Sequence, residues 1–91
     1  MKEITLYRNG QNIKVPVLYT IFDISAGIFD EPFETPAKST RDALLKYLKS
    51  KDRKENFVRS SNKHCEYCVT PLFYDEGTRY RAGKRVWYKV L

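Results

Sequence analysis

The residues best suited to bind a ligand lie between positions 78 and 91. Cations alternate there with aromatic and β-branched residues, and the segment contains no acidic residue. Successive side chains of a β-strand point to opposite faces, so a strand of this composition has one face that packs and one that carries positive charge. A charged face of this kind suits a phosphate backbone or an acidic protein surface.

A single tryptophan stands among these cations. Val86 and Tyr88 alternate with it and are the residues that we expect to pack inward. Arg85, Trp87 and Lys89 then face outward together. An exposed tryptophan beside cations can stack on a nucleic-acid base, although Trp and Arg also dominate the hot spots of protein interfaces. The remaining interpretation is a core tryptophan with a solvated basic face.

Positive charge is concentrated in the second part of the chain. The net charge is +6, with three cations and five acids in residues 1–36 and fourteen cations and six acids in residues 37–91. This asymmetry favours a polyanionic or acidic partner, although a solvated basic surface also keeps a small domain soluble. The residues predicted to contact nucleic acid or a partner are Arg79, Arg81, Lys84, Arg85, Trp87, Lys89, Lys49, Lys51, Arg53 and Lys54.

A C-x-x-C motif formed by Cys65 and Cys68 follows the only histidine, His64. Two thiolates at this spacing can reach one tetrahedral zinc ion, but a second pair of ligands is missing. A redox C-x-x-C needs a helix N-terminus to lower the thiol pKa, whereas this pair leads into a predicted strand. We therefore expect two structural thiols and no cofactor, with a metal or disulfide role as the alternatives.

Four carboxylates in the first part of the chain form an acidic group. They could supply a metal site or an acid–base pair, or they could dock against the basic half of a second copy. No Gly-rich phosphate loop, nucleophile elbow or paired histidine accompanies them, which predicts a non-enzymatic protein. The four are Asp23, Asp30, Glu31 and Glu34.

The first predicted element is a β-hairpin around Asn9-Gly10, since both residues tolerate the positive φ of a two-residue turn. This turn pairs Arg8 with Gln11 and places the apolar side chains of both strands on one face. Pro16 cannot donate to a ladder and marks an edge or a bulge. The apolar run 17–24 follows, as a separate buried strand or as a continuation past the bulge.

The second half predicts one helix and a second hairpin. Ser39 can cap a helix over residues 40–52, and an apolar stripe recurs along it. Residues 28–38 are expected to form a loop, and 55–61 a short strand or link. Strands are predicted over 66–74, where Pro71 indicates an edge or a bulge, and over 78–91, with a bulge at Ala82-Gly83.

These elements predict a single α+β domain over residues 1–91, with an antiparallel sheet of two hairpins (about four to five strands) and one helix on one face. No apolar run approaches the roughly 20 residues needed to cross a bilayer, and no signal-peptide core is present. The expectation is a cytoplasmic monomer or homodimer that binds nucleic acid or an acidic or nucleoprotein partner, but no membrane. The chain is also similar in type to the small accessory proteins of phages and mobile elements, which implies the alternative of an inhibitor or adaptor of a host protein or nucleoprotein machine.

Overall fold

The computed structural model describes residues 2–24, 32–61 and 65–91, and in these residues the chain forms eight strands and one helix. The predicted α+β class is confirmed, but the predicted number of strands was wrong. The elements, in chain order, are β1 (Glu3–Arg8), β2 (Gln11–Pro16), β3 (Leu18–Asp23), β4 (Phe33–Pro36), α1 (Thr40–Ser50), β5 (Phe57–Ser60), β6 (Tyr67–Asp75), β7 (Thr78–Arg81) and β8 (Val86–Val90).

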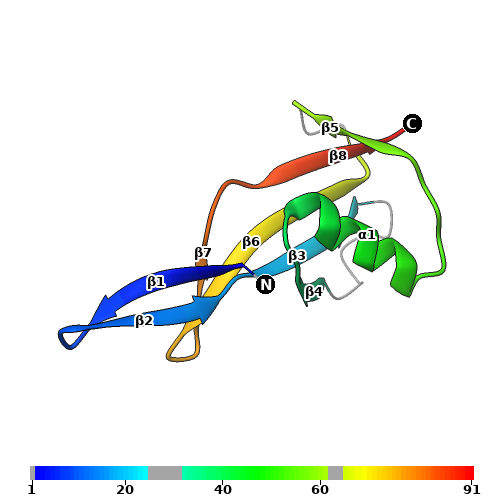
Figure 1. Ribbon diagram of the computed structural model, residues 1–91. Coiled ribbons are helices and arrows are strands. Elements are labelled where there is room, and N and C mark those ends of the chain that lie inside the picture. The colour runs from blue at the N-terminus through cyan, green and yellow to red at the C-terminus, as the bar shows by residue number, and fades with distance from the viewer. Residues whose placement is uncertain (1, 25–31, 62–64) are drawn as a thin grey trace.

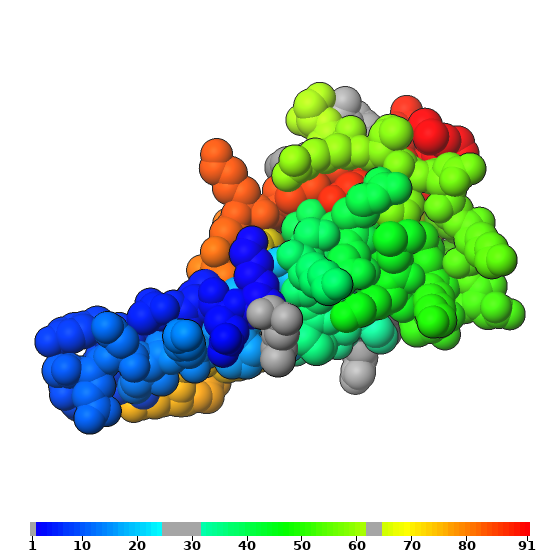
Figure 2. All heavy atoms as spheres, in the orientation of Figure 1, coloured from blue at the N-terminus to red at the C-terminus, as the bar shows by residue number. Residues whose placement is uncertain are grey.

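The first hairpin forms a two-stranded sheet of its own and projects from one end of the body (Figures 1 and 2). Its predicted register is confirmed, from the pairing of Arg8 with Gln11 onward, and the turn residues Asn9 and Gly10 have φ values of 52° and 76°. An isolated hairpin is marginally stable in water. This one is held by an ion pair between Arg8 and Asp75 at the end of β6.

The other six strands form one sheet in the order β4-β3-β6-β8-β5, with β7 paired to β6 as well. The strand count exceeded the prediction because Pro16 ends β2 and leaves the following apolar run as the separate strand β3. Part of the predicted loop 28–38 forms β4, which pairs with β3 from Leu18 to Ile21. The remainder of that loop up to residue 31 lies outside the described residues, as do residues 62–64.

The predicted last strand is interrupted, and its two halves pair with different parts of β6. Arg81 in β7 lies opposite Leu72, whereas Val86 in β8 lies opposite Val69. Pro71 faces the break, where the Ala82 N–H donates to its carbonyl oxygen (2.9 Å). Because proline has no N–H to donate to a neighbouring strand, β6 changes its partner from β7 to β8 at a position where few hydrogen bonds are lost. Of the two predicted alternatives for Pro71, the edge was wrong, since β6 is central, and Pro71 lies instead where the pairing of β6 is interrupted.

Helix α1 lies against one face of this sheet (Figure 1). The Ser39 hydroxyl accepts a hydrogen bond from the Asp42 N–H (3.1 Å), as the predicted cap requires. Across the interface, the Tyr88 hydroxyl hydrogen-bonds Thr40 (2.7 Å). The buried stripe of the helix consists, as predicted, of Ala43, Leu44, Tyr47 and Leu48. In the described part of the chain, no helix has the length and apolar character needed to cross a bilayer.

Candidate functional site

The face of the six-stranded sheet opposite α1, called here the open face, is covered by no element in the described residues. Phe22, Cys68 and Trp87 form one row across β3, β6 and β8, because each is paired in register with the next. Their sequence neighbours Ile21, Val69 and Val86 lie in the core, so this row points the other way. Neighbouring strands are about 4.8 Å apart, which places the two aromatic residues roughly 10 Å from each other.

Both aromatic residues of this row are accessible. Phe22 is 45% exposed, and Trp87 is half-buried. The Arg85 guanidinium lies over the Trp87 ring, 5.7 Å from its centroid. A cation over an indole ring is an attractive arrangement that also holds the ring in place. Trp87 is therefore oriented as predicted, with Arg85 beside it, while Val86 and Tyr88 are buried on the helix side.

A hollow of about 270 Å³ opens on the same face between β3, β6 and β7. Two buried threonines, Thr20 and Thr70, lie at its base. Around them stand Arg79, Arg81 and Arg85, with Phe22 at the side. This hollow, called the arginine pocket, brings together cations from both halves of the interrupted strand, together with hydroxyl groups from β3 and β6.

In the described part of the chain, one carboxylate approaches the arginine pocket. Glu34 on β4 accepts hydrogen bonds from the hydroxyls of Thr20 (3.1 Å) and Tyr74 (2.8 Å). Its Oε1 lies 3.8 Å from Nη1 of Arg79. Among the described residues, Arg81 and Arg85 have no ion-pair partner, so the pocket carries a positive surplus.

The C-x-x-C motif adjoins the row of aromatic residues without forming a thiolate site. Cys68 lies in β6, and burial raises its pKa despite the opposing effect of Arg85 and a hydrogen bond from Thr70. Burial also raises the pKa of Cys65. His64 lies outside the described residues, within which no three His, Cys, Asp or Glu side chains gather as metal ligands do.

The predicted acidic group is engaged with other residues where it is described. Besides Glu34 at the pocket, Asp23 at the end of β3 accepts hydrogen bonds from Arg53 (2.9 Å) and from the Tyr47 hydroxyl (3.2 Å). Asp30 and Glu31 lie outside the described residues. The described carboxylates therefore act as partners for cations and hydroxyls of the same chain.

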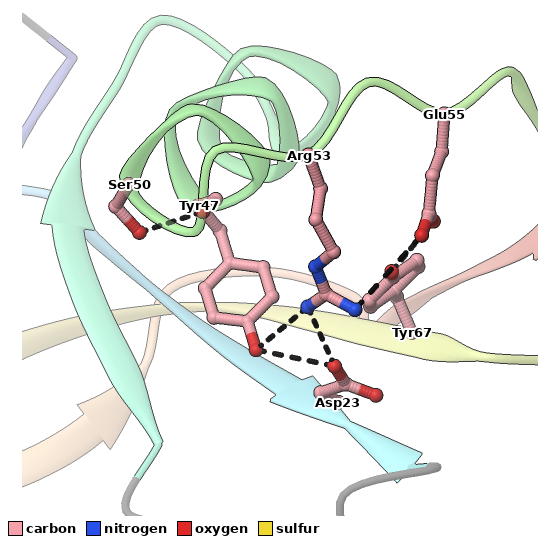
Figure 3. Close-up of polar contacts among 6 residues, drawn as sticks. All are labelled: Asp23, Tyr47, Ser50, Arg53, Glu55 and Tyr67. Carbon is pink, nitrogen blue, oxygen red and sulfur yellow. Dashed lines mark hydrogen bonds and ion pairs between the residues drawn. The ribbon is translucent and has the colours of Figure 1, made fainter.

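Arg53, a predicted binding residue, lies inside a network that ties the end of α1 to the sheet (Figure 3). Its guanidinium pairs with Asp23, contacts the Tyr47 hydroxyl at 3.3 Å and lies 6.0 Å from the centroid of the Tyr67 ring. The Tyr67 hydroxyl donates to Glu55 at 2.6 Å. These contacts give Arg53 a role in folding.

The remaining predicted cations are separated from the arginine pocket. Lys49 and Lys54 line a hollow of about 550 Å³ beside α1, together with Leu45 and Leu48. The Lys51 ammonium lies over the Tyr47 ring, 5.9 Å from its centroid. The cations at the end of the helix thus belong to the opposite side of the sheet.

Two cations of the C-terminal segment also differ in where they lie. Lys84 lines a third hollow, between the first hairpin and the start of α1. Lys89 is exposed and alternates with Tyr88, so it shares the open face with Trp87. Of the predicted set, five residues therefore share the open face: Arg79, Arg81, Arg85, Trp87 and Lys89.

Phe22, Thr20 and Thr70 were missed in the sequence, because they belong to strands that read as apolar on both faces. No protein-family model matches the chain, and no curated protein or solved structure matches it significantly. Function is therefore inferred from the residues of the open face.

Proposed function

We propose that the protein is a non-enzymatic binding module for single-stranded nucleic acid, which it contacts through the open face. The observation that carries this proposal is the row of Phe22 and Trp87 beside three arginines. Unpaired bases expose π-faces that stack on aromatic side chains, while a cationic groove follows the backbone. A duplex hides those π-faces, so we expect a preference for single strands.

The charge of the chain supports the same partner. Three arginines and Lys89 lie along one side of the open face, where a strand stacked on Phe22 and Trp87 would bring its phosphates. Cations held close together attract a polyanion and release its counterions when it binds.

The test is to measure the affinity for a 20-nucleotide single strand and for its duplex between 50 and 200 mM salt. Four phosphate contacts give a log–log slope of about −3 for a single strand, so affinity should fall about fifty-fold over this range. Arg81→Gln should make the slope shallower by about 0.7. Lys14→Gln is the matched control, because it removes one charge from an exposed position of the first hairpin.

Two results would contradict the proposal. One is the absence of binding to either oligonucleotide at 50 mM salt. The other is an equal loss of affinity in the Arg81 and Lys14 variants, which would mean that net charge alone, and no particular face, attracts the ligand.

The alternative function, an inhibitor or adaptor of a host protein, is favoured by the hollow beside α1. Leu45 is 47% exposed there, next to Leu48 and the lysines at the helix end. An apolar hollow with a charged rim resembles the anatomy of a protein interface. Leu45→Asp should abolish such a complex while leaving oligonucleotide affinity unchanged, so the two functions can be separated in one variant.

A further inference from the structure

We propose that the arginine pocket binds a terminal phosphate monoester, so that the protein recognises the phosphorylated end of a nucleic-acid strand. This inference rests on the proposed function and specifies where the strand ends on the open face. The proposed phosphate site is formed by Arg79, Arg81 and Arg85 over Thr20 and Thr70. A backbone phosphate of the strand contacts the remaining cation of the open face, Lys89.

The shape of the pocket is the first reason. The hollow has a base of side chains that are almost inaccessible to solvent. Thr20 is 1% exposed and Thr70 is 7% exposed. The volume of about 270 Å³ is large enough for a phosphate and part of the attached sugar. Phe22 then lies beside the hollow in a position to stack on the terminal base.

The charge balance is the second reason. In the residues that the structure describes, three guanidinium groups and one carboxylate, that of Glu34, lie at the pocket, a surplus of two positive charges. An internal phosphodiester carries one negative charge, whereas a monoester carries about −1.5 to −2 at pH 7 and offers three acceptor oxygens. The planar fork of arginine can donate two parallel hydrogen bonds to such a group. A terminal phosphate therefore neutralises the pocket better than an internal one.

The third reason is that the backbone holds the arginines in place. Arg81 ends β7 and Arg85 precedes β8, and the break between these strands is fixed by the hydrogen bond from Ala82 to Pro71. Gly83 passes so close to Pro71 that a Cβ atom there would lie 3.2 Å from its Cγ. Both arginines lie near Cys68: burial raises the pKa of this thiol, and the positive charges of Arg81 and Arg85 lower it in part. The pocket is thus formed by the fold and not by chance neighbours on a flexible loop.

The experiment compares three versions of one ten-nucleotide strand, carrying a 5′-phosphate, a 3′-phosphate or no terminal phosphate. At pH 7.5 and 150 mM salt we expect one phosphorylated strand to bind at least tenfold more tightly than the unphosphorylated strand. The preferred end identifies the polarity of the bound strand. Lowering the pH from 7.5 to 5.5 should reduce the preference, because the monoester takes up its second proton near pH 6.

Arg81→Lys and Lys89→Gln are the matched variants. The lysine at 81 keeps the charge but loses the fork, so the preference for the phosphorylated end should fall at least threefold while the salt slope stays unchanged. Lys89→Gln should reduce affinity for all three strands equally. Thermal melting checks that both variants fold.

The outcomes separate this inference from the proposed function. Equal affinity for all three strands would overturn the phosphate site and leave the single-strand module intact. Failure of all three to bind would overturn both. A preference that survives in Arg81→Lys would place the recognition of the strand end outside the arginine pocket.

Discussion

Replacement of Arg53 tests whether this predicted binding residue serves the fold. The Arg53 guanidinium pairs with Asp23 at 2.9 Å, and the carboxylate side chain is only 7% exposed. Arg53→Met keeps the length and much of the apolar stem but removes the charge. Asp23 would then retain the hydrogen bond from Tyr47 while losing its cationic partner.

The size of the effect follows from the unequal burial of the two partners. Removing one member of a fully buried pair costs about 3–5 kcal/mol, because the other charge is left uncompensated. The Arg53 side chain is 36% exposed, so water screens the pair and replaces part of the lost interaction. We therefore expect a loss of about 2 kcal/mol, between the values for buried and exposed pairs. For a domain of this size that lowers the melting temperature by roughly 8–16 °C.

The assay is thermal and urea denaturation of Arg53→Met beside Lys54→Met. Lys54 is the adjacent exposed cation, and its replacement should change stability by less than about 0.5 kcal/mol. In an Asp23→Asn background the Arg53 replacement should cost clearly less, since no buried charge is left behind. Equal melting temperatures for the two single variants would refute the structural role. Weakened oligonucleotide binding at unchanged stability would return Arg53 to the binding surface.

Three further predictions follow from the burial of side chains. Trp87→Ala should lower stability by about 1–2 kcal/mol, because the ring is half-buried, and should weaken single-strand binding by about 1–3 kcal/mol. Tyr7→Ala is the control: Tyr7 is 77% exposed on the first hairpin, and its replacement should change neither stability nor binding. Tyrosine side chains lose their phenol protons near pH 10 in the unfolded chain, whereas four tyrosines have raised pKa values in the folded protein. The stability that these four protonated tyrosines contribute is therefore complete below pH 10 and is lost as the pH rises. Absorbance at 295 nm, which follows ionisation, and circular dichroism, which follows unfolding, should change together. These tyrosines are Tyr19, Tyr47 and Tyr67, mainly through burial, and Tyr74, mainly through its hydrogen bond to Glu34. Alkylation of Cys65 and Cys68 by iodoacetamide at pH 8 should be slower than that of free glutathione and should accelerate in denaturant.

Local signals predicted the elements that depend on neighbours in the sequence. Asn9-Gly10 specified both the turn and the register of the first hairpin, since a two-residue loop allows only one pairing. Ser39 specified the start of α1 through a bond that closes within three residues. The strand β4 carried no such signal. It is short, it follows a proline, and it is defined by pairing with β3 more than ten residues away, which sequence periodicity does not reveal.

The candidate site shows the same division between local and long-range information. Alternation along residues 78–91 correctly indicated that Trp87 and Arg85 share a face, because alternation is a property of one strand. It also places Arg81 on that face, but it could not indicate that Arg81 lies close to Arg85, since an uninterrupted strand would carry these two residues about 13 Å apart. The break opposite Pro71 changes this geometry and places both residues around Thr20 and Thr70. Pro71, which lies on β6 and has no N–H to donate, thus determines where Arg81 and Arg85 converge.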